Sequence, residues 1–153
     1  MNCSKCGASN QDRAAACCKC GVSLSQAIWN PNAIALSSLL FSPVFGAFLH
    51  AINWHDLGET EKANSSMTWF YVSLVYWAMV SAMPTLATGA AMALLYFFIW
   101  YFASSRSQAK FVKANVGADY PRKSWGKPLL CGVVGLIAYV IALFVLEYVM
   151  RPE

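Results

Sequence analysis

The sequence predicts an α-helical integral membrane protein with three to four hydrophobic helices and a small cysteine-rich head at the N-terminus. Of the 153 residues, 58% are hydrophobic and only 12% are charged, whereas a soluble domain usually has about 25% charged residues. So few charged side chains cannot cover a soluble globule, which excludes an ordinary soluble enzyme and a disordered chain. Five of the six cysteines lie in the first twenty residues and set the head apart from the apolar body.

Residues 1–24 form the head, in which two C-x-x-C pairs are each followed directly by a glycine. Two residues between the cysteines of a pair aim both thiolates at one point, and the glycine accepts the positive φ that closes the turn. Two such turns placed face to face make a tetrahedral four-sulfur site, which suits zinc. We therefore expect one structural Zn²⁺ with no position open for substrate, bound by Cys3, Cys6, Cys17 and Cys20.

Other uses of these cysteines compete with zinc. Iron in a rubredoxin-type site has similar geometry, and the spacing does not distinguish the two metals. A redox dithiol normally lies at the strand-to-helix junction of a larger fold, which this segment is too short to contain. Disulfides need an oxidising compartment, and the polar N-terminus does not read as a signal peptide. Cys18 and Cys131 fall outside the duplicated pattern, and we expect neither to bind the metal.

The head resembles the zinc-ribbon domain found at the N-terminus of many bacterial membrane proteins. The resemblance rests on Cys3, Cys6, Gly7, Cys17, Cys20 and Gly21. The head departs from that family at three positions. Ser4 and Cys18 replace the proline that is often found inside each C-x-x-C turn, and Ala16 replaces a common aromatic residue. The resemblance implies a structural zinc ion in a bacterial inner-membrane protein. Because 24 residues cannot bury a useful core, metal binding must supply the folding free energy, typically about 10–16 kcal/mol.

The charges of the head favour a protein partner over nucleic acid. Lys5, Arg13 and Lys19 stand against Asp12, and no aromatic side chain is available to stack on a base. Nucleic-acid-binding modules usually combine a larger basic patch with stacking rings. We therefore expect the head to dock a protein or to regulate one.

A linker over residues 25–32 leads to the membrane body, residues 33–153, in which four apolar stretches are candidate spans. A helix needs about 20 largely apolar residues to cross a bilayer, and the stretches are 33–54, 67–83, 85–103 and 129–150. Pro43 and Gly46 interrupt the first stretch. Because proline removes a helical hydrogen bond and glycine frees the backbone, we expect a kink or a re-entrant hairpin there.

Charge asymmetry orients the body. The segment between the third and fourth stretches carries six cations, Arg106, Lys110, Lys113, Arg122, Lys123 and Lys127. Cations next to a span mark the cytoplasmic side, and fixing topology is the commoner role of such a cluster. The alternative is that these side chains also attract anionic lipid headgroups, at about 1 kcal/mol each. A reduced head belongs in the cytoplasm as well. If the first stretch re-enters, the head and the basic segment lie on the same side of the membrane, and three spans remain, which is the arrangement that we expect. If all four stretches span, the head and the basic segment lie on opposite sides.

Residues 32–62 carry a second resemblance. The run Leu40-Phe41-Ser42-Pro43-x-x-Gly46 is followed by Asn53-Trp54-x-x-Leu57-Gly58 and by Lys62-Ala63. This pattern is similar to a segment that recurs in small bacterial multi-pass membrane proteins of uncharacterised function. The resemblance implies an architecture rather than an activity.

A second polar site is conceivable near the end of the first stretch, where His50, His55 and Glu59 lie. His55 and Glu59 are four residues apart and would share a helix face, a spacing that suits a metal or a proton site. The simpler interpretation is a polar cap at the membrane interface. No nucleophile-elbow motif or phosphate loop accompanies these residues, so we expect no enzymatic activity.

These features predict a non-enzymatic bacterial inner-membrane protein with a cytoplasmic zinc ribbon that docks a protein partner. The alternative is a component of a small oligomeric transporter or channel, in which the broken first stretch lines a pathway. That alternative requires a homo-oligomer.

Overall fold

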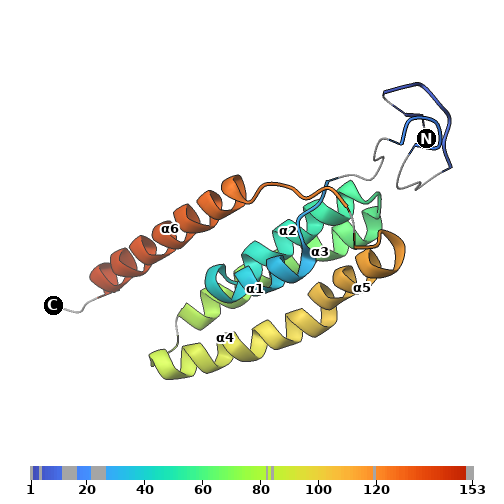
Figure 1. Ribbon diagram of the computed structural model, residues 1–153. Helices are drawn as coiled ribbons and strands as arrows, with labels where there is room; N and C mark the ends of the chain where they lie inside the picture. Colours follow the sequence, from blue (N-terminus) through green and yellow to red (C-terminus); the bar gives the residue numbers. More distant parts are fainter. Residues whose placement is uncertain are drawn as a thin grey trace.

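The computed structural model describes residues 2–3, 5–11, 17–21, 27–81, 83, 85–118 and 120–150, and for residues 86, 146, 147 and 150 it describes the backbone alone. Ser4, residues 12–16 and the first part of the predicted linker lie outside this set. Within it the chain contains helices and no strand. In order these are α1 (Pro31–Phe41), α2 (Pro43–Asp56), α3 (Thr60–Ser81), α4 (Leu86–Trp100), the π-helix η1 (Tyr101–Ser105), α5 (Arg106–Asn115) and α6 (Gly126–Met150) (Figure 1).

The first apolar stretch folds as a hairpin of two helices. Asn30 caps α1 by accepting a hydrogen bond from the N–H of Asn32 at 3.0 Å. α1 ends at Phe41, and the next residue, Ser42, has a φ of 90°, in the left-handed region. Pro43 then begins α2, as proline often begins a helix because its missing N–H would be unpaired there. The predicted break is therefore confirmed, and it falls at Ser42, immediately before Pro43.

The two helices of the hairpin pack at very short range. A Cβ atom on Gly46 of α2 would lie 2.0 Å from the Ser38 hydroxyl oxygen in α1 and 2.6 Å from the Trp100 ring in α4. Only glycine leaves room for both neighbours at this point. Gly46 thus explains why α1 and α2 lie side by side and why α4 closes over them.

Gly58 turns the chain from α2 into α3, with a φ of +76°. α3 packs along α2 and is longer than predicted, since it begins at Thr60 rather than at residue 67. Lys62 in the added first turn forms an ion pair at 3.1 Å with Glu59, the residue just before the helix. A hydropathy pattern misses such a polar turn, although its hydrogen bonds extend the same helix.

α4, η1 and α5 form one continuous helix, Ala87–Asn115, of 29 residues. The sequence predicts that the third stretch ends at residue 103. In the structure the π-helical turn joins α4 and α5 without a break, because Ser104, Ser105 and Gln108 are buried against other helices. Polar residues that pack inside a bundle do not end a helix, whereas hydropathy treats them as the start of a loop.

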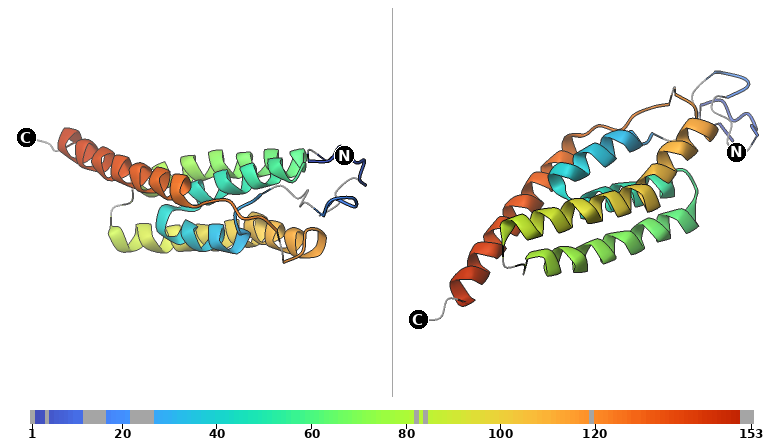
Figure 2. Two further views of the ribbon diagram at one scale, coloured as in Figure 1. Left: turned by 45° about the horizontal axis from the view of Figure 1, so that its top comes forward. Right: turned by 90° about the horizontal axis from the view of Figure 1, so that it is seen from below.

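α6 begins three residues earlier than predicted and crosses the rest of the bundle obliquely (Figure 2). It touches the bundle at Gly132, where an added Cβ would lie 3.0 Å from the Phe41 ring. Most of its apolar side chains are exposed, among them Leu130, Ile137 and Phe144. Ala87–Asn115 and Gly126–Val145 are the two helices in the described residues that are long and apolar enough to cross a membrane.

The linker, the α2–α3 turn and the segment before α6 meet at one end of the bundle, and the C-terminus lies at the other (Figure 1). Ile28 pairs with this segment through two backbone hydrogen bonds of 3.1 Å, one to the Pro121 carbonyl and one from the Lys123 N–H. Lys123 also forms an ion pair with Asp56 at the end of α2. The cysteine-rich head and the basic segment are therefore adjacent to the same end of the bundle.

Candidate metal centre

The sulfur atoms of Cys3, Cys6, Cys17 and Cys20 all lie within 4.8 Å of one another, so the four residues can hold one metal ion. The Cys3 and Cys20 sulfurs are 3.6 Å apart and those of Cys6 and Cys17 are 3.5 Å apart. Four sulfurs at about 2.3 Å from a zinc ion at the centre of a tetrahedron would be roughly 3.8 Å apart. The observed spacing is close to this value.

Both halves of the site use the same backbone turn. The N–H of Gly7 donates to the carbonyl of Cys3, and the N–H of Gly21 donates to that of Cys17, each at 2.9 Å. Gly7 and Gly21 have φ values of +69° and +67°, the region that side chains other than glycine rarely adopt. The glycines that follow each pair therefore have the conformation that the sequence pattern predicts.

Asn10 joins the two halves, and sequence reasoning missed it. Its side-chain N–H₂ donates to the carbonyl of Ala8 at 2.8 Å and to the sulfur of Cys17 at 3.6 Å. Its side-chain oxygen accepts from the N–H of Cys18 at 2.8 Å. Groups that hydrogen-bond to metal ligands fix their orientation and tune their affinity. The only indication of this role in the sequence is that Asn10 is a polar residue between the two C-x-x-C pairs.

The backbone of the second C-x-x-C pair also stabilises the Cys17 sulfur as a thiolate. The backbone N–H groups of Cys20 and Lys19 lower the pKa of the Cys17 thiol to about 6. The Lys19 N–H lies 3.5 Å from this sulfur. Because the thiolate is the form that binds metal, these donors favour the metal-binding form of Cys17. Cys18 is exposed beside it, and Cys131 is exposed far away on α6.

His50, His55 and Glu59, the predicted second polar site, are not brought together. His50 is buried, with 1% of its surface exposed, while His55 is exposed and Glu59 pairs with Lys62. Both ring nitrogens of His50 have partners, since Nδ1 lies 2.5 Å from the Gln108 side-chain oxygen and Nε2 lies 2.8 Å from the Ser105 hydroxyl. The ring therefore has no nitrogen left for a metal in this arrangement.

His50 belongs instead to a buried polar network that connects α2, η1 and α5. The Gln108 amide donates to the backbone carbonyl of His50 at 3.0 Å, and the Asn53 amide donates to the Gln108 oxygen at 3.1 Å. Asn53 also bonds twice to the backbone of Trp29 in the linker. His50 and Asn53 face Ser105 and Gln108, and each pair is three residues apart along its helix. The only indication of this network in the sequence is that two polar residues are three positions apart in each helix.

The six cations of the basic segment have different surroundings. Lys123 is partly buried, pairs with Asp56 and lies 4.5 Å from the centre of the Trp29 ring. Trp29 in turn donates from its ring N–H to the carbonyl of Ser124 at 2.9 Å. The other five side chains are exposed, namely Arg106, Lys110, Lys113, Arg122 and Lys127. Lys123 therefore fastens the linker to the bundle, and the others can meet an anionic surface.

Comparisons with known proteins identify no relative of this chain. No protein family matches the sequence, and neither a curated protein nor a solved structure is significantly similar to it.

Proposed function

We propose that the chain is a bacterial inner-membrane protein in which a cytoplasmic zinc ribbon docks a protein partner and the helical body is the membrane anchor. The observation that carries the proposal is the convergence of four cysteine sulfurs within 4.8 Å. A closed site of four thiolates stabilises a fold and leaves no coordination position for a substrate. Its role is then to shape a surface, which fits binding better than catalysis.

The body supports a three-span arrangement in this proposal. The α1–α2 hairpin enters and leaves at the same end of the bundle because Trp29 and Asn53 are hydrogen-bonded to each other. In this proposal the hairpin re-enters rather than spans, and the two helices that are long and apolar enough to cross, α4–η1–α5 and α6, are joined by the less apolar α3 as the third crossing helix. This places the head and the five exposed cations on one side, which the distribution of positive charge assigns to the cytoplasm.

The linker supports a regulatory role for the ribbon. Trp29 is bonded to both Asn53 in α2 and Ser124 before α6, and Ile28 pairs with the same segment. The linker is thus fastened to the bundle at Ile28, eight residues after Cys20. A partner bound to the ribbon would lie directly over the cytoplasmic end of the helices.

The alternative is an oligomeric transporter or channel component. It needs a polar pathway, but the buried polar groups His50, Asn53 and Gln108 bond to one another and to the linker. Their arrangement favours a structural role. A stable oligomer in native mass spectrometry would favour the alternative, and a monomer would count against it.

The docking function is tested by affinity purification from membranes. The full chain is compared with the double variant Cys17→Ser plus Cys20→Ser, and the matched control is Cys18→Ser plus Cys131→Ser. We expect the first variant to reach the membrane at a normal level but to lose its protein partners, while the control keeps them. Identical partner sets for all three proteins would refute docking through the ribbon.

A further inference from the structure

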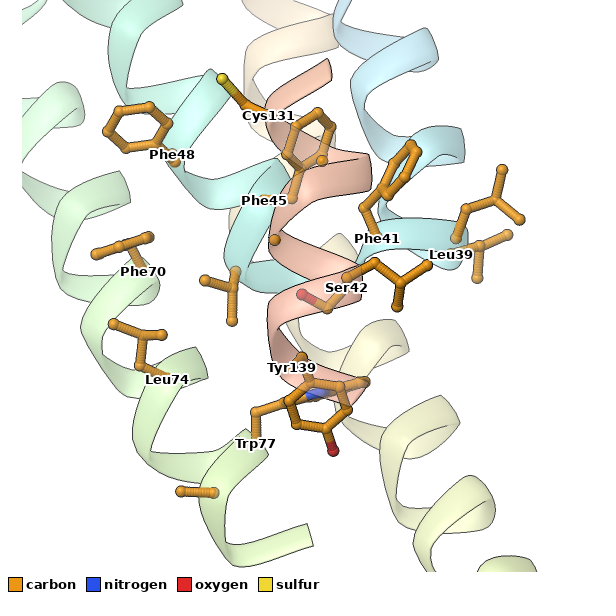
Figure 3. A pocket seen from close by; sticks show the side chains of 16 residues that line it. Leu39, Phe41, Ser42, Phe45, Phe48, Phe70, Leu74, Trp77, Cys131 and Tyr139 are labelled. Atoms are coloured by element: carbon orange, nitrogen blue, oxygen red, sulfur yellow. The ribbon is translucent and has the colours of Figure 1, made fainter. Parts of the chain in front are cut away.

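An apolar groove of about 540 Å³ lies between α6 and the helices α1, α2 and α3 (Figure 3). Its walls are mainly apolar, and six of the sixteen lining residues are aromatic, namely Phe41, Phe45, Phe48, Phe70, Trp77 and Tyr139. Its size is within the range of about 300–1,000 Å³ that is typical of ligand pockets. The groove exists because α6 presents small residues, Gly132 and Gly135, to this face.

The groove is elongated along α6 and almost free of unpaired polar groups. From Cys131 to Tyr139 the helix rises by roughly 12 Å, at about 1.5 Å per residue. At the end toward the C-terminus of α6 the Tyr139 hydroxyl lies 2.6 Å from the Ser81 hydroxyl, so it has a hydrogen-bond partner within the protein. Such a slot fits an unbranched hydrocarbon chain better than a polar molecule.

A lysine, Lys127, precedes the groove-lining part of α6 in the chain. Lys127 lies one helical turn before Cys131, and its side chain is exposed. In the described part of the chain it pairs with no carboxylate, in contrast to Lys123, which pairs with Asp56. Because the apolar run of α6 begins just after Lys127, this ammonium group is at the expected depth of lipid headgroups.

We propose that the groove binds an acyl chain of an anionic phospholipid of the cytoplasmic leaflet, with the headgroup at Lys127. The apolar walls take the chain, and the ammonium group complements the phosphate. This inference rests on the membrane placement proposed above, but it does not depend on the docking role of the ribbon. The lipid fills the space between α6 and the bundle, which the protein's own side chains leave open.

Two variants separate the acyl chain from the headgroup. Gly135→Leu fills the groove, since a Cβ at Gly135 has no atom within 4 Å, and leucine favours a helix over glycine. Lys127→Gln removes the cation alone. Val134→Leu, on an exposed face of α6, is the control for the first variant, and Lys113→Gln, exposed on α5, is the control for the second.

The test is native mass spectrometry of the full chain released from vesicles of phosphatidylglycerol or phosphatidylcholine. We expect one retained phosphatidylglycerol per chain, lost in Gly135→Leu and kept in Val134→Leu. Lys127→Gln should reduce the preference for phosphatidylglycerol about fivefold, the effect of one cation near an anionic headgroup, and Lys113→Gln should not. Equal retention in Gly135→Leu and the wild-type protein would overturn the proposal.

Two further measurements complete the test. A phosphatidylglycerol with a photoreactive acyl chain should cross-link to peptides of α2 and α6 that line the groove; cross-links elsewhere would overturn the proposal. A dimer that is lost in Gly135→Leu would mean that a second copy fills the groove, which also overturns it. Carbonate extraction checks the membrane placement separately, because release from the membrane refutes that placement, whereas retention without bound lipid refutes the lipid site alone.

Discussion

Asn53 and Trp29 exchange two hydrogen bonds, one of 3.0 Å from the Trp29 N–H to the Asn53 side-chain oxygen and one of 2.8 Å from the Asn53 amide to the Trp29 carbonyl. This pair joins the linker to the end of α2, 24 residues later. It closes the α1–α2 hairpin and ties the polar network around His50 to the linker that follows the cysteine-rich head.

Asn53→Ala should therefore loosen the hairpin. The substitution leaves the N–H and the carbonyl of Trp29 without their partners, and an unpaired buried polar group destabilises a protein by about 1–3 kcal/mol. We expect the unfolding temperature in detergent to fall clearly while the metal content stays unchanged. Asn115→Ala, at an exposed amide on α5, is the control. An unchanged unfolding temperature would mean that the pair does not hold the hairpin together.

Gly46→Ala should destabilise the bundle through steric overlap. The added methyl group would meet Ser38 at 2.0 Å and Trp100 at 2.6 Å, and overpacking of this kind typically destabilises by about 1–3 kcal/mol. Gly135→Ala is the matched control, because its methyl group enters open space. Thermal unfolding of both variants in detergent checks the prediction, which fails if the two behave alike.

Asn10→Ala should weaken the metal site without removing a ligand. The amide bonds to the Cys17 sulfur and orients the second pair, and loss of such a partner usually lowers metal affinity about 10–100-fold. Competition with a chelator measures the affinity. Lys19→Ala is the control, since Lys19 contributes its backbone N–H, which the substitution keeps. Equal affinities for Asn10→Ala and the wild-type protein would show that Asn10 is dispensable.

His50→Ala should lower stability but leave one metal ion per chain. The two ring nitrogens bond to Ser105 and Gln108, so loss of the ring removes the buried Ser105 hydroxyl's side-chain partner and one of the two partners of the Gln108 oxygen, and it opens a cavity. Elemental analysis of the purified protein counts the metal. Cys17→Ser should abolish the bound metal, and Cys18→Ser should not. A lower metal content in His50→Ala would restore the second metal site as a hypothesis.

The sequence predicts the metal ligands better than it predicts the packing. The two C-x-x-C-G turns are local, since each depends on four residues and one glycine conformation, so their spacing alone indicates which sulfurs converge. The contribution of Asn10 depends on how the two turns face each other, and a local pattern does not contain this information. The same holds for His50, whose partners Ser105 and Gln108 are more than fifty residues away.

The helix boundaries fail for a related reason. Hydropathy predicts where apolar residues stop, and it therefore ends the third stretch at residue 103, although Ser105 and Gln108 continue the helix inside the bundle. The break at Ser42 is easier to predict from the sequence, because Pro43 and Gly46 are local signals. The return of the hairpin to the end where it began depends on the contact between Trp29 and Asn53. This is a tertiary contact, which a local pattern does not predict.

The central claim is that the ribbon and the basic segment share the cytoplasmic side because α1–α2 re-enters. Labelling intact cells with a membrane-impermeant thiol reagent tests it most directly. In a Cys131→Ser background, Cys18 reports on the ribbon, Asn115→Cys reports on the basic segment, and a cysteine added after the last residue reports on the C-terminus. The account predicts that the first two react only after permeabilisation and that the third reacts in intact cells. Reaction of Asn115→Cys from outside, with Cys18 protected, would contradict it.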